Sequence, residues 1–173
     1  METRQATMLG VDIAGAGSRC KEWVSLRHQL YLPFLAATAK IKGRRTFLDE
    51  GDGGVAIMPP AVTALYLAQN VIPYVARKAN QRLQNPMRLR FMIHRGEVIE
   101  DEWGYRGKGL ELVFRTLQAE QLKQYHDRVA KSLAIVAVSS HMYREIPENT
   151  WDGLIIRNKD TRALTWTRPI MTA

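Results

Sequence analysis

The 173-residue sequence lacks the usual marks of secreted, membrane-spanning and zinc-stabilised proteins. Its single cysteine, Cys20, cannot form an internal disulfide, and no apolar run approaches the length of a membrane span. The N-terminal METRQATMLG does not show the charged start, apolar middle and small-residue cleavage site of a secretory signal. The four histidines have no metal-ligand spacing with Cys20 or with one another. We therefore expect a cytoplasmic protein with no membrane segment and no zinc site.

Internal repeats, flexible linkers and low-complexity segments are also missing from the sequence. A chain of this length fits one domain that buries a sizeable hydrophobic core. Its content of 46% hydrophobic and 24% charged residues is typical of a globular protein. Residues 1–173 are therefore predicted to form a single domain.

Acidic residues are fewer than basic ones, with 17 against 25, which gives a formal charge of +8. Such a protein attracts polyanions, which include nucleoside triphosphates, nucleic acids and anionic lipid surfaces. The bases are dispersed along the chain, which favours a solvated surface with local basic sites. The basic-Gly-aromatic-Gly-aromatic strand motif of a common RNA-binding module is absent, so no specific nucleic-acid partner is expected.

The hydrophobic pattern predicts strands and helices that alternate along the chain. Strands or hairpins are expected over residues 6–13, 46–60, 88–100, 132–139 and 154–167, with a hairpin-like turn at 101–107. Helices are expected over residues 21–40, 62–83, 110–124 and 141–146. Pro33 is expected to kink or split the first helix, and Pro73 to interrupt the second. This order predicts an α+β, ferredoxin-like fold in which helices flank a mainly antiparallel sheet.

Two aspartates follow apolar strand patterns and are expected to meet at one edge of the sheet. Asp12 lies near the end of the first strand, and Asp52 lies in the hairpin turn of LDEGDGGVAIM. Two carboxylates held close together repel each other unless a cation lies between them, and Mg²⁺ accepts one or two carboxylates together with water and phosphate oxygens. The alternative is that each aspartate is only a turn former, because Asp-Gly is common in hairpins.

The segment AGAGSRC follows the first strand and offers room for phosphate groups. Gly15 and Gly17 would let backbone N–H groups approach a triphosphate, and the start of the next helix would add its positive dipole end. The segment lacks the third glycine of a dinucleotide fingerprint and the Gly-Lys-Ser/Thr end of a phosphate loop. Neither of those two sites is therefore predicted.

Four motifs in order, VDIAGAGSR, EGDGGVAIM, LRFMIHRGEV and YRGKGLELVFRTLQAE, resemble the class III nucleotidyl cyclase catalytic domain over residues 6–169. The resemblance implies the cyclase fold and a reaction that joins the 3′-oxygen of a nucleoside triphosphate to its own α-phosphorus. It also implies two Mg²⁺ or Mn²⁺ ions, held by Asp12, Asp52 and the backbone carbonyl of Ile13. By the same resemblance, Gly15, Ala16 and Gly17 lie beside the phosphates of the substrate.

The resemblance assigns Arg115 to the family arginine that contacts the phosphates in the transition state. A guanidinium fork binds two phosphate oxygens at once, which lysine does not reproduce. Four residues earlier, the family usually has an asparagine that orients the ribose, whereas this chain has Glu111. The closing turn IIRNKD resembles the family's lysine-containing turn, so either Arg157 or Lys159 is expected to contact the triphosphate.

The positions that select the base depart from both purine patterns of the family. Adenine-specific members carry lysine and aspartate there, guanine-specific members carry glutamate and a small residue, and this chain carries Leu48 and Lys108. Different groups at the base edge favour a different base, because unpaired buried polar groups reject the wrong ligand. The chain resembles the short bacterial pyrimidine cyclases of anti-phage defence, and UTP is favoured over CTP. The alternatives are an ATP or GTP cyclase and a catalytically dead cyclase-fold module that binds nucleotides or regulates a partner.

The resemblance also implies an assembly. Active sites of the family form between two protomers, with the aspartates from one and the asparagine and arginine positions from the other. A homodimer with two equivalent shared sites is therefore expected. A separate effector that senses the cyclic nucleotide is the expected downstream partner.

Overall fold

The computed structural model describes residues 1–15, 23–129, 131–147 and 150–170, without the side chain of Trp23. Cys20 and two predicted substrate contacts, Ala16 and Gly17, lie outside these residues. The strands are β1 (Glu2–Ile13), β2 (Thr46–Asp49), β3 (Gly53–Met58), β4 (Leu89–Asp101), β5 (Gly104–Arg106), β6 (Ala134–Ser139), β7 (Asp152–Asn158) and β8 (Thr161–Ile170). The helical elements are α1 (Trp23–Ala39), α2 (Ala64–Tyr66), η2 (Leu67–Val71), α3 (Ile72–Asn80), α4 (Lys108–Gln118), α5 (Glu120–Arg128) and α6 (Ser140–Tyr143).

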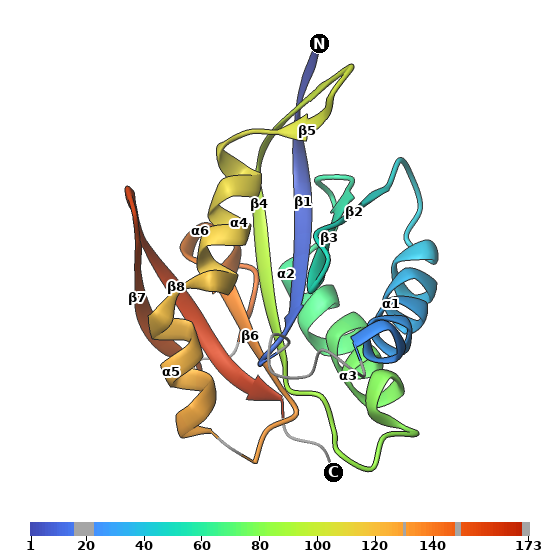
Figure 1. Cartoon of the computed structure of the whole chain (residues 1–173). Helices are drawn as coiled ribbons and strands as arrows, with labels where there is room; N and C mark the ends of the chain where they lie inside the picture. Colours follow the sequence, from blue (N-terminus) through green and yellow to red (C-terminus); the bar gives the residue numbers. More distant parts are fainter. Residues whose placement is uncertain (16–22, 130, 148–149, 171–173) are drawn as a thin grey trace.

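The strands form one sheet in the order β2-β3-β1-β4-β6-β8-β7, and β5 pairs with β4 beyond this row. β4 and β6 run parallel, while the other pairs in the described part of the chain are antiparallel. Helices lie on both faces of the sheet, with α1 and α3 on one side and α4 and α5 on the other (Figure 1). The predicted α+β fold, a mainly antiparallel sheet with flanking helices, is confirmed.

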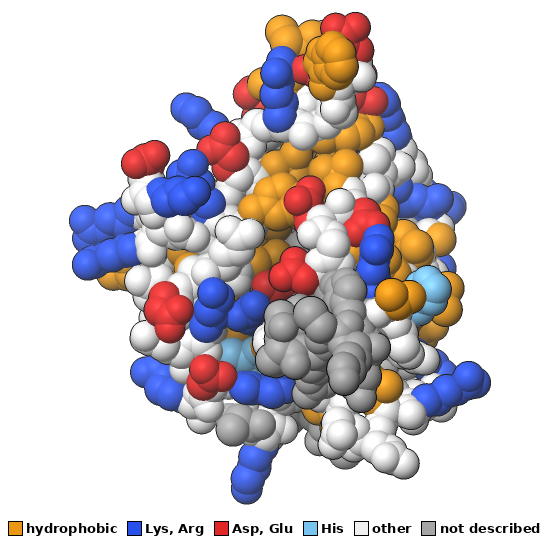
Figure 2. Space-filling model, viewed as in Figure 1, with side chains coloured by type: hydrophobic (Ala, Val, Ile, Leu, Met, Phe, Trp, Pro, Cys, Tyr) orange, Lys and Arg blue, Asp and Glu red, His pale blue; other side chains and the backbone are white. Residues whose placement is uncertain are grey.

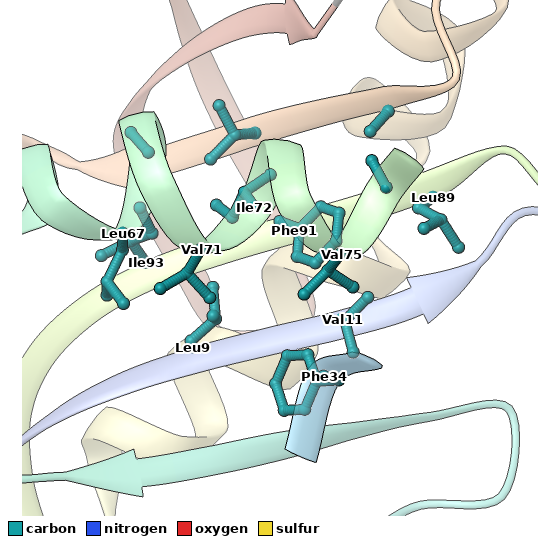
Figure 3. Close-up of a cluster of buried hydrophobic side chains, with 14 of the residues drawn as sticks. Leu9, Val11, Phe34, Leu67, Val71, Ile72, Val75, Leu89, Phe91 and Ile93 are labelled. Carbon is teal, nitrogen blue, oxygen red and sulfur yellow. The ribbon is translucent and has the colours of Figure 1, made fainter. Parts of the chain in front are cut away.

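Alternating side chains of the central strands fill two hydrophobic cores, one on each face of the sheet. Leu9 and Val11 of β1 point toward α1 and α3, where they pack with Phe34, Ile72 and other buried side chains (Figure 3). The neighbouring positions of β1 point the other way and pack under α4 and α5. This alternation directs Asp12 to the α4 face, because successive strand residues point to opposite faces.

The helices differ from the expectation in two places. α1 continues through Pro33 without a break, so the alternative of a split helix is wrong. The segment expected as one helix over residues 110–124 forms α4 and α5, separated by Ala119 with an extended backbone (φ −66°, ψ 136°). The break redirects the chain so that α5 buries Leu122 and Tyr125 in the core under α4.

The expected helix over residues 62–83 forms three consecutive segments, α2, η2 and α3. Thr63 caps the first segment, because its hydroxyl accepts a hydrogen bond from the Tyr66 N–H. Pro73 lies in the first turn of α3, directly after the wider turn of η2. A missing backbone N–H is tolerated there, and the predicted interruption by Pro73 therefore takes the form of a change in helix type.

Candidate active site

Asp12 lies at the end of β1, directly opposite Arg90 of β4 in the antiparallel register. The Arg90 guanidinium donates two hydrogen bonds to its carboxylate, from Nε to Oδ1 and from Nη2 to Oδ2, both at 2.8 Å. Both side chains are almost fully buried, with 9% of the Arg90 side chain and 11% of the Asp12 side chain exposed. The first predicted metal ligand is therefore held in one orientation by a two-pronged ion pair.

The protonation of Asp12 reflects this burial. Burial raises the pKa of the Asp12 carboxyl to about 6, although the hydrogen bonds and charge of Arg90 act in the opposite direction. The negative charge of Asp52, which raises the pKa, and the positive charge of Lys123, which lowers it, make smaller contributions to the same value. The carboxylate form therefore prevails at pH 7 and above.

Asp52 lies in the turn between β2 and β3, beside the end of β1. Its backbone carbonyl accepts a hydrogen bond of 3.1 Å from the Ile13 N–H, which ties the turn to β1. Gly51 has a φ of +83°, a conformation that favours glycine, and permits the tight turn. The Asp52 side chain is exposed and makes no ion pair with another described residue, so it is open to a ligand from solvent.

A pocket of about 300 Å³ joins the two aspartates on the α4 face of the sheet. Its acidic lining consists of Asp12, Asp52 and Glu50, and the other walls are Val11, Gly53, Gly54, Phe114, Leu117 and Gln118. Figure 2 shows acidic side chains beside an apolar strip on this side of the molecule. The tertiary structure therefore brings Asp12 and Asp52 to one cavity, with α4 as its opposite wall.

The carboxylate oxygens in this pocket are suitable ligands for a divalent cation that also binds phosphate. Within the described ranges there is no cluster of three or more histidine, cysteine, aspartate or glutamate residues arranged to hold a metal. Mg²⁺ is usually coordinated by one or two carboxylates, with water and phosphate oxygens at its remaining coordination positions. A carboxylate oxygen has two lone pairs, so Asp12 keeps acceptor sites beyond its hydrogen bonds with Arg90.

The helix α1 supports the turn that carries Asp52. The Tyr31 hydroxyl hydrogen-bonds to Oδ1 of Asp49 at 2.9 Å and to the backbone carbonyl of Gly53. Arg27 forms an ion pair with the same Asp49 carboxylate. Burial raises the pKa of the Tyr31 hydroxyl, which keeps it a proton donor.

Arg115 lies on the side of α4 that faces the hairpin of β7 and β8. Its Nη1 donates a hydrogen bond of 2.8 Å to the Thr161 hydroxyl, and Asn158 donates one of 3.0 Å to its backbone carbonyl. Glu111 is its neighbour one helical turn earlier, with 3.6 Å between Arg115 Nη2 and Glu111 Oε2. Arg115, Glu111 and the hairpin of β7 and β8 therefore form one group, and among the described residues no hydrogen bond or ion pair joins Arg115 to Asp12.

The remaining predicted residues lie around these two groups. Leu48 is half-buried against the core under α4, while Lys108 is exposed at the start of α4. Gly15 is exposed with a φ of +72°, which fits the expected turn after β1. Arg157 is exposed on β7, and its backbone N–H donates to Gln121.

Sequence reasoning missed Arg90 as part of the site. The signal was an arginine within LRFMIHRGEV, in a strand expected at the centre of the sheet. Arginine is almost never fully buried without a partner, so its position predicts a nearby carboxylate. Only the register of β1 and β4 identifies that partner as Asp12.

In the described part of the chain, no helix is both long and apolar enough to cross a membrane. No protein-family model and no curated protein matches the sequence. Known structures do resemble it, at low sequence identity and over nearly the whole chain.

Three solved structures illustrate this similarity. A bacterial light-regulated adenylyl cyclase matches 96% of this chain and 90% of its own, with 12% identity and a TM-score of 0.67. The adenylate/guanylate cyclase/hydrolase of Silicibacter pomeroyi matches 96% and 97% of the two chains, with 15% identity and a TM-score of 0.60. The non-canonical dimeric guanylyl cyclase domain of a fusion protein from the fungus Blastocladiella emersonii matches 96% and 97% of the two chains, with 13% identity and a TM-score of 0.60. This chain therefore has the fold of nucleotidyl cyclase catalytic domains.

Proposed function

We propose that this protein is a metal-dependent nucleotidyl cyclase, which converts a nucleoside triphosphate to a 3′,5′-cyclic mononucleotide and pyrophosphate. The observation that carries the proposal is the meeting of Asp12 and Asp52 in one pocket beside α4, on a chain with the cyclase fold. Each aspartate alone is equally consistent with a turn former. Their shared pocket favours a common ligand, and the carboxylates suit a cation that accompanies triphosphate.

In the proposed reaction, the 3′-oxygen of the ribose forms a bond with the α-phosphorus of the same nucleotide. The bond between the α-phosphorus and the bridging oxygen of pyrophosphate breaks, and the proton of the 3′-hydroxyl passes to water or to the leaving pyrophosphate. Asp12, Asp52 and the Ile13 carbonyl would hold two Mg²⁺ or Mn²⁺ ions. When bound, such ions supply a more acidic 3′-hydroxyl and neutralise the charge of the triphosphate.

The second half of the proposed site consists of Arg115 and the turn between β7 and β8. Arg115 would stabilise charge on the phosphates with its guanidinium, and Lys159 or Arg157 would bind the triphosphate. Arg115 is directed to Thr161 and not to Asp12 of the same chain. This favours a homodimer in which each pocket receives Arg115 from the partner protomer.

A pyrimidine triphosphate is the proposed substrate, with UTP favoured over CTP. The support is the pair of residues at the base-selecting positions, since Leu48 and Lys108 match neither purine pattern. The cyclic product would act as a signal for a separate effector, and an anti-phage response is the proposed setting.

The direct test is to incubate the purified protein with each of the four ribonucleoside triphosphates and Mn²⁺. We expect pyrophosphate and a cyclic mononucleotide, with the highest rate from UTP, measured by chromatography and mass spectrometry. Asp12→Asn or Asp52→Asn should lower the rate by about a hundredfold or more, because the cation ligands are lost. Absence of product from all four nucleotides would exclude the cyclase activity.

A catalytically dead nucleotide-binding module is the second candidate, favoured by Glu111. The Glu111 carboxylate would be unfavourable beside a triphosphate unless a base or cation neutralises it. Arg115 Nη2 is 3.6 Å from Glu111 Oε2, but the proposed reaction assigns the same arginine to the phosphates. Glu111→Asn distinguishes the two functions. If the wild-type protein binds triphosphate without turnover and the variant gains turnover, Glu111 is the cause of inactivity. If the wild-type protein is active and the variant is slower, Glu111 belongs to the catalytic site.

A further inference from the structure

We infer that Arg90 is a built-in counter-cation of Asp12, which makes divalent-cation binding in this pocket depend on a bound triphosphate. The inference rests on the proposed function, because it assigns a role to Arg90 within the same site. The cation and the triphosphate are expected to bind together, and the free protein is expected to bind the cation weakly.

The first support is the geometry of the ion pair. Nε and Nη2 of Arg90 each bond to a different oxygen of Asp12, at 2.8 Å. This parallel pair of hydrogen bonds occupies the space between the two carboxylate oxygens. The outer lone pairs of the oxygens remain for a cation. Asp12 is thereby restricted to binding a cation through one oxygen, a mode compatible with the octahedral Mg²⁺ and less so with the two-oxygen binding common for Ca²⁺.

The second support is the charge of the pocket without substrate. Arg90 neutralises Asp12, and the positive charge of Lys123 also acts on this carboxylate. The other acids that line the pocket, Asp52 and Glu50, are exposed to solvent, which weakens their interaction with a cation. A divalent cation that binds near Asp12 meets the positive charge of Arg90 in a buried setting, where charges are poorly screened.

A triphosphate changes this balance because it brings several negative charges to the same place. The phosphate oxygens then supply both the ligands and the charge that Asp12 and Asp52 alone do not provide. Coupling of this kind is reciprocal, so the cation must strengthen triphosphate binding by the same factor. Arg90 therefore suppresses cation binding in the free protein and leaves it possible in the complex.

The experiment is a titration with Mn²⁺ of the protein free of nucleotide, followed by electron paramagnetic resonance of the unbound ion. We expect weak binding to the wild-type protein and at least about tenfold tighter binding to Arg90→Met, which removes the charge and keeps much of the side-chain volume. Arg90→Lys is the matched control, because it keeps the charge without the fork, and it should bind Mn²⁺ as weakly as the wild type. Equal or weaker binding by a folded Arg90→Met variant would overturn the inference.

A second measurement on the wild-type protein serves if Arg90→Met does not fold, as judged by circular dichroism. Inorganic tripolyphosphate is the probe, because it carries the phosphate charge without a base. The affinity for Mn²⁺ should rise about tenfold or more when the protein is saturated with tripolyphosphate, after correction for the ion bound by the probe itself. Tight Mn²⁺ binding without the probe would contradict the inference.

The two proposals fail in different ways. If Asp12→Asn does not weaken Mn²⁺ binding in the presence of tripolyphosphate, the cation site itself is wrong. If cation binding follows the expected pattern and no cyclic nucleotide forms, the inference about Arg90 holds and the cyclase activity does not. If cyclic nucleotide forms and Arg90→Met binds Mn²⁺ no more tightly than the wild type, only the inference about Arg90 fails.

Discussion

His94 is a buried histidine on β4 whose environment predicts a pH-dependent stability. Its Nδ1 lies 3.0 Å from the Ser139 hydroxyl, and its ring packs edge-on against His141, with 5.1 Å between ring centroids. Burial, together with the smaller effect of the charge of His141, lowers the pKa of His94 to about 4. The neutral imidazole is therefore the form that the folded protein contains at neutral pH.

The sign of the pH effect follows from this lowered pKa. Between about pH 6.5 and pH 4, the unfolded chain binds a proton at His94 that the folded protein does not bind. The free energy of unfolding should therefore fall as the pH falls through this range, by roughly 1–3 kcal/mol from this residue. His94→Gln should lose less stability than the wild type over the same range, measured by chemical denaturation at each pH. His28→Gln is the matched control at an exposed position, and equal slopes for wild type and His94→Gln would contradict the prediction.

At the scale of elements, α1 and the turn between β2 and β3 depend on each other. Tyr31 of α1 bonds through its hydroxyl to Asp49 and to the Gly53 carbonyl, and its ring packs edge-on against Phe47 of β2. The turn between Asp49 and Gly53 carries Asp52. The position of one predicted cation ligand therefore depends on a hydrogen bond from a helix on the other face of the sheet.

Tyr31→Phe tests this dependence, because it removes the hydroxyl and keeps the ring contact with Phe47. We expect the free energy of unfolding to fall by roughly 1–2 kcal/mol, since the Gly53 carbonyl loses a buried hydrogen bond. Tyr66→Phe is the control, because Tyr66 is exposed on α2. Thermal and denaturant unfolding measure the change, and an equal effect of the two substitutions would show that the Tyr31 hydroxyl does not stabilise the turn.

The group of Arg115 depends on packing between elements in the same way. Thr161 and Asn158, from the ends of β8 and β7, orient the arginine and the backbone at its position in α4. Lys159, with a φ of +50°, lies in the turn that joins the two strands. Lys159 thus lies between two residues that bond to Arg115, although it is 44 positions from Arg115 in the sequence.

In the whole molecule, the two halves of the proposed site are not joined by a hydrogen bond or ion pair between Arg115 and either aspartate within the described part of one chain. Asp12 and Asp52 line the pocket, whereas Arg115 is bonded to the hairpin of β7 and β8. A symmetric dimer brings the first half of each protomer to the second half of its partner. Sedimentation should accordingly give twice the 19.7 kDa mass of the chain, and a monomer at micromolar concentration would contradict the dimer.

Mixing two inactive variants tests whether the sites are shared. Asp12→Asn and Arg115→Ala should each lower the rate of cyclisation by about a hundredfold or more. After unfolding and refolding together in equal amounts, about half of the dimers are mixed, and one of their two sites has neither substitution. The mixture should recover about one quarter of the wild-type rate, measured as cyclic nucleotide formed. No recovery, despite dimers shown by sedimentation, would mean that each chain forms its site alone.

The amino-acid sequence alone was enough to predict the order of most elements and the meeting of Asp12 and Asp52 at one edge of the sheet. Apolar runs and the Asp-Gly turn encode these features locally, because strand alternation and turn chemistry depend on neighbouring residues. Asp12 and Asp52 were found in this way, although their shared function is still a proposal. The prediction of a single helix over residues 110–124 was wrong. The extended backbone at Ala119 ends α4 and lets α5 pack Leu122 and Tyr125 into the core, a tertiary contact that local sequence does not specify.

The side chain that faces Asp12 could not be predicted from local sequence and became visible only in the folded sheet. Arg90 is 78 positions away, and the pairing of β1 with β4 places the two residues directly opposite each other. The need for glycine at position 53 also depends on strand pairing, because a Cβ there would lie 2.1 Å from the Val11 carbonyl oxygen of the neighbouring strand. Local pattern predicts that a strand forms, but the register between distant strands depends on the packing of the whole sheet. That register decides the charge around the candidate cation site.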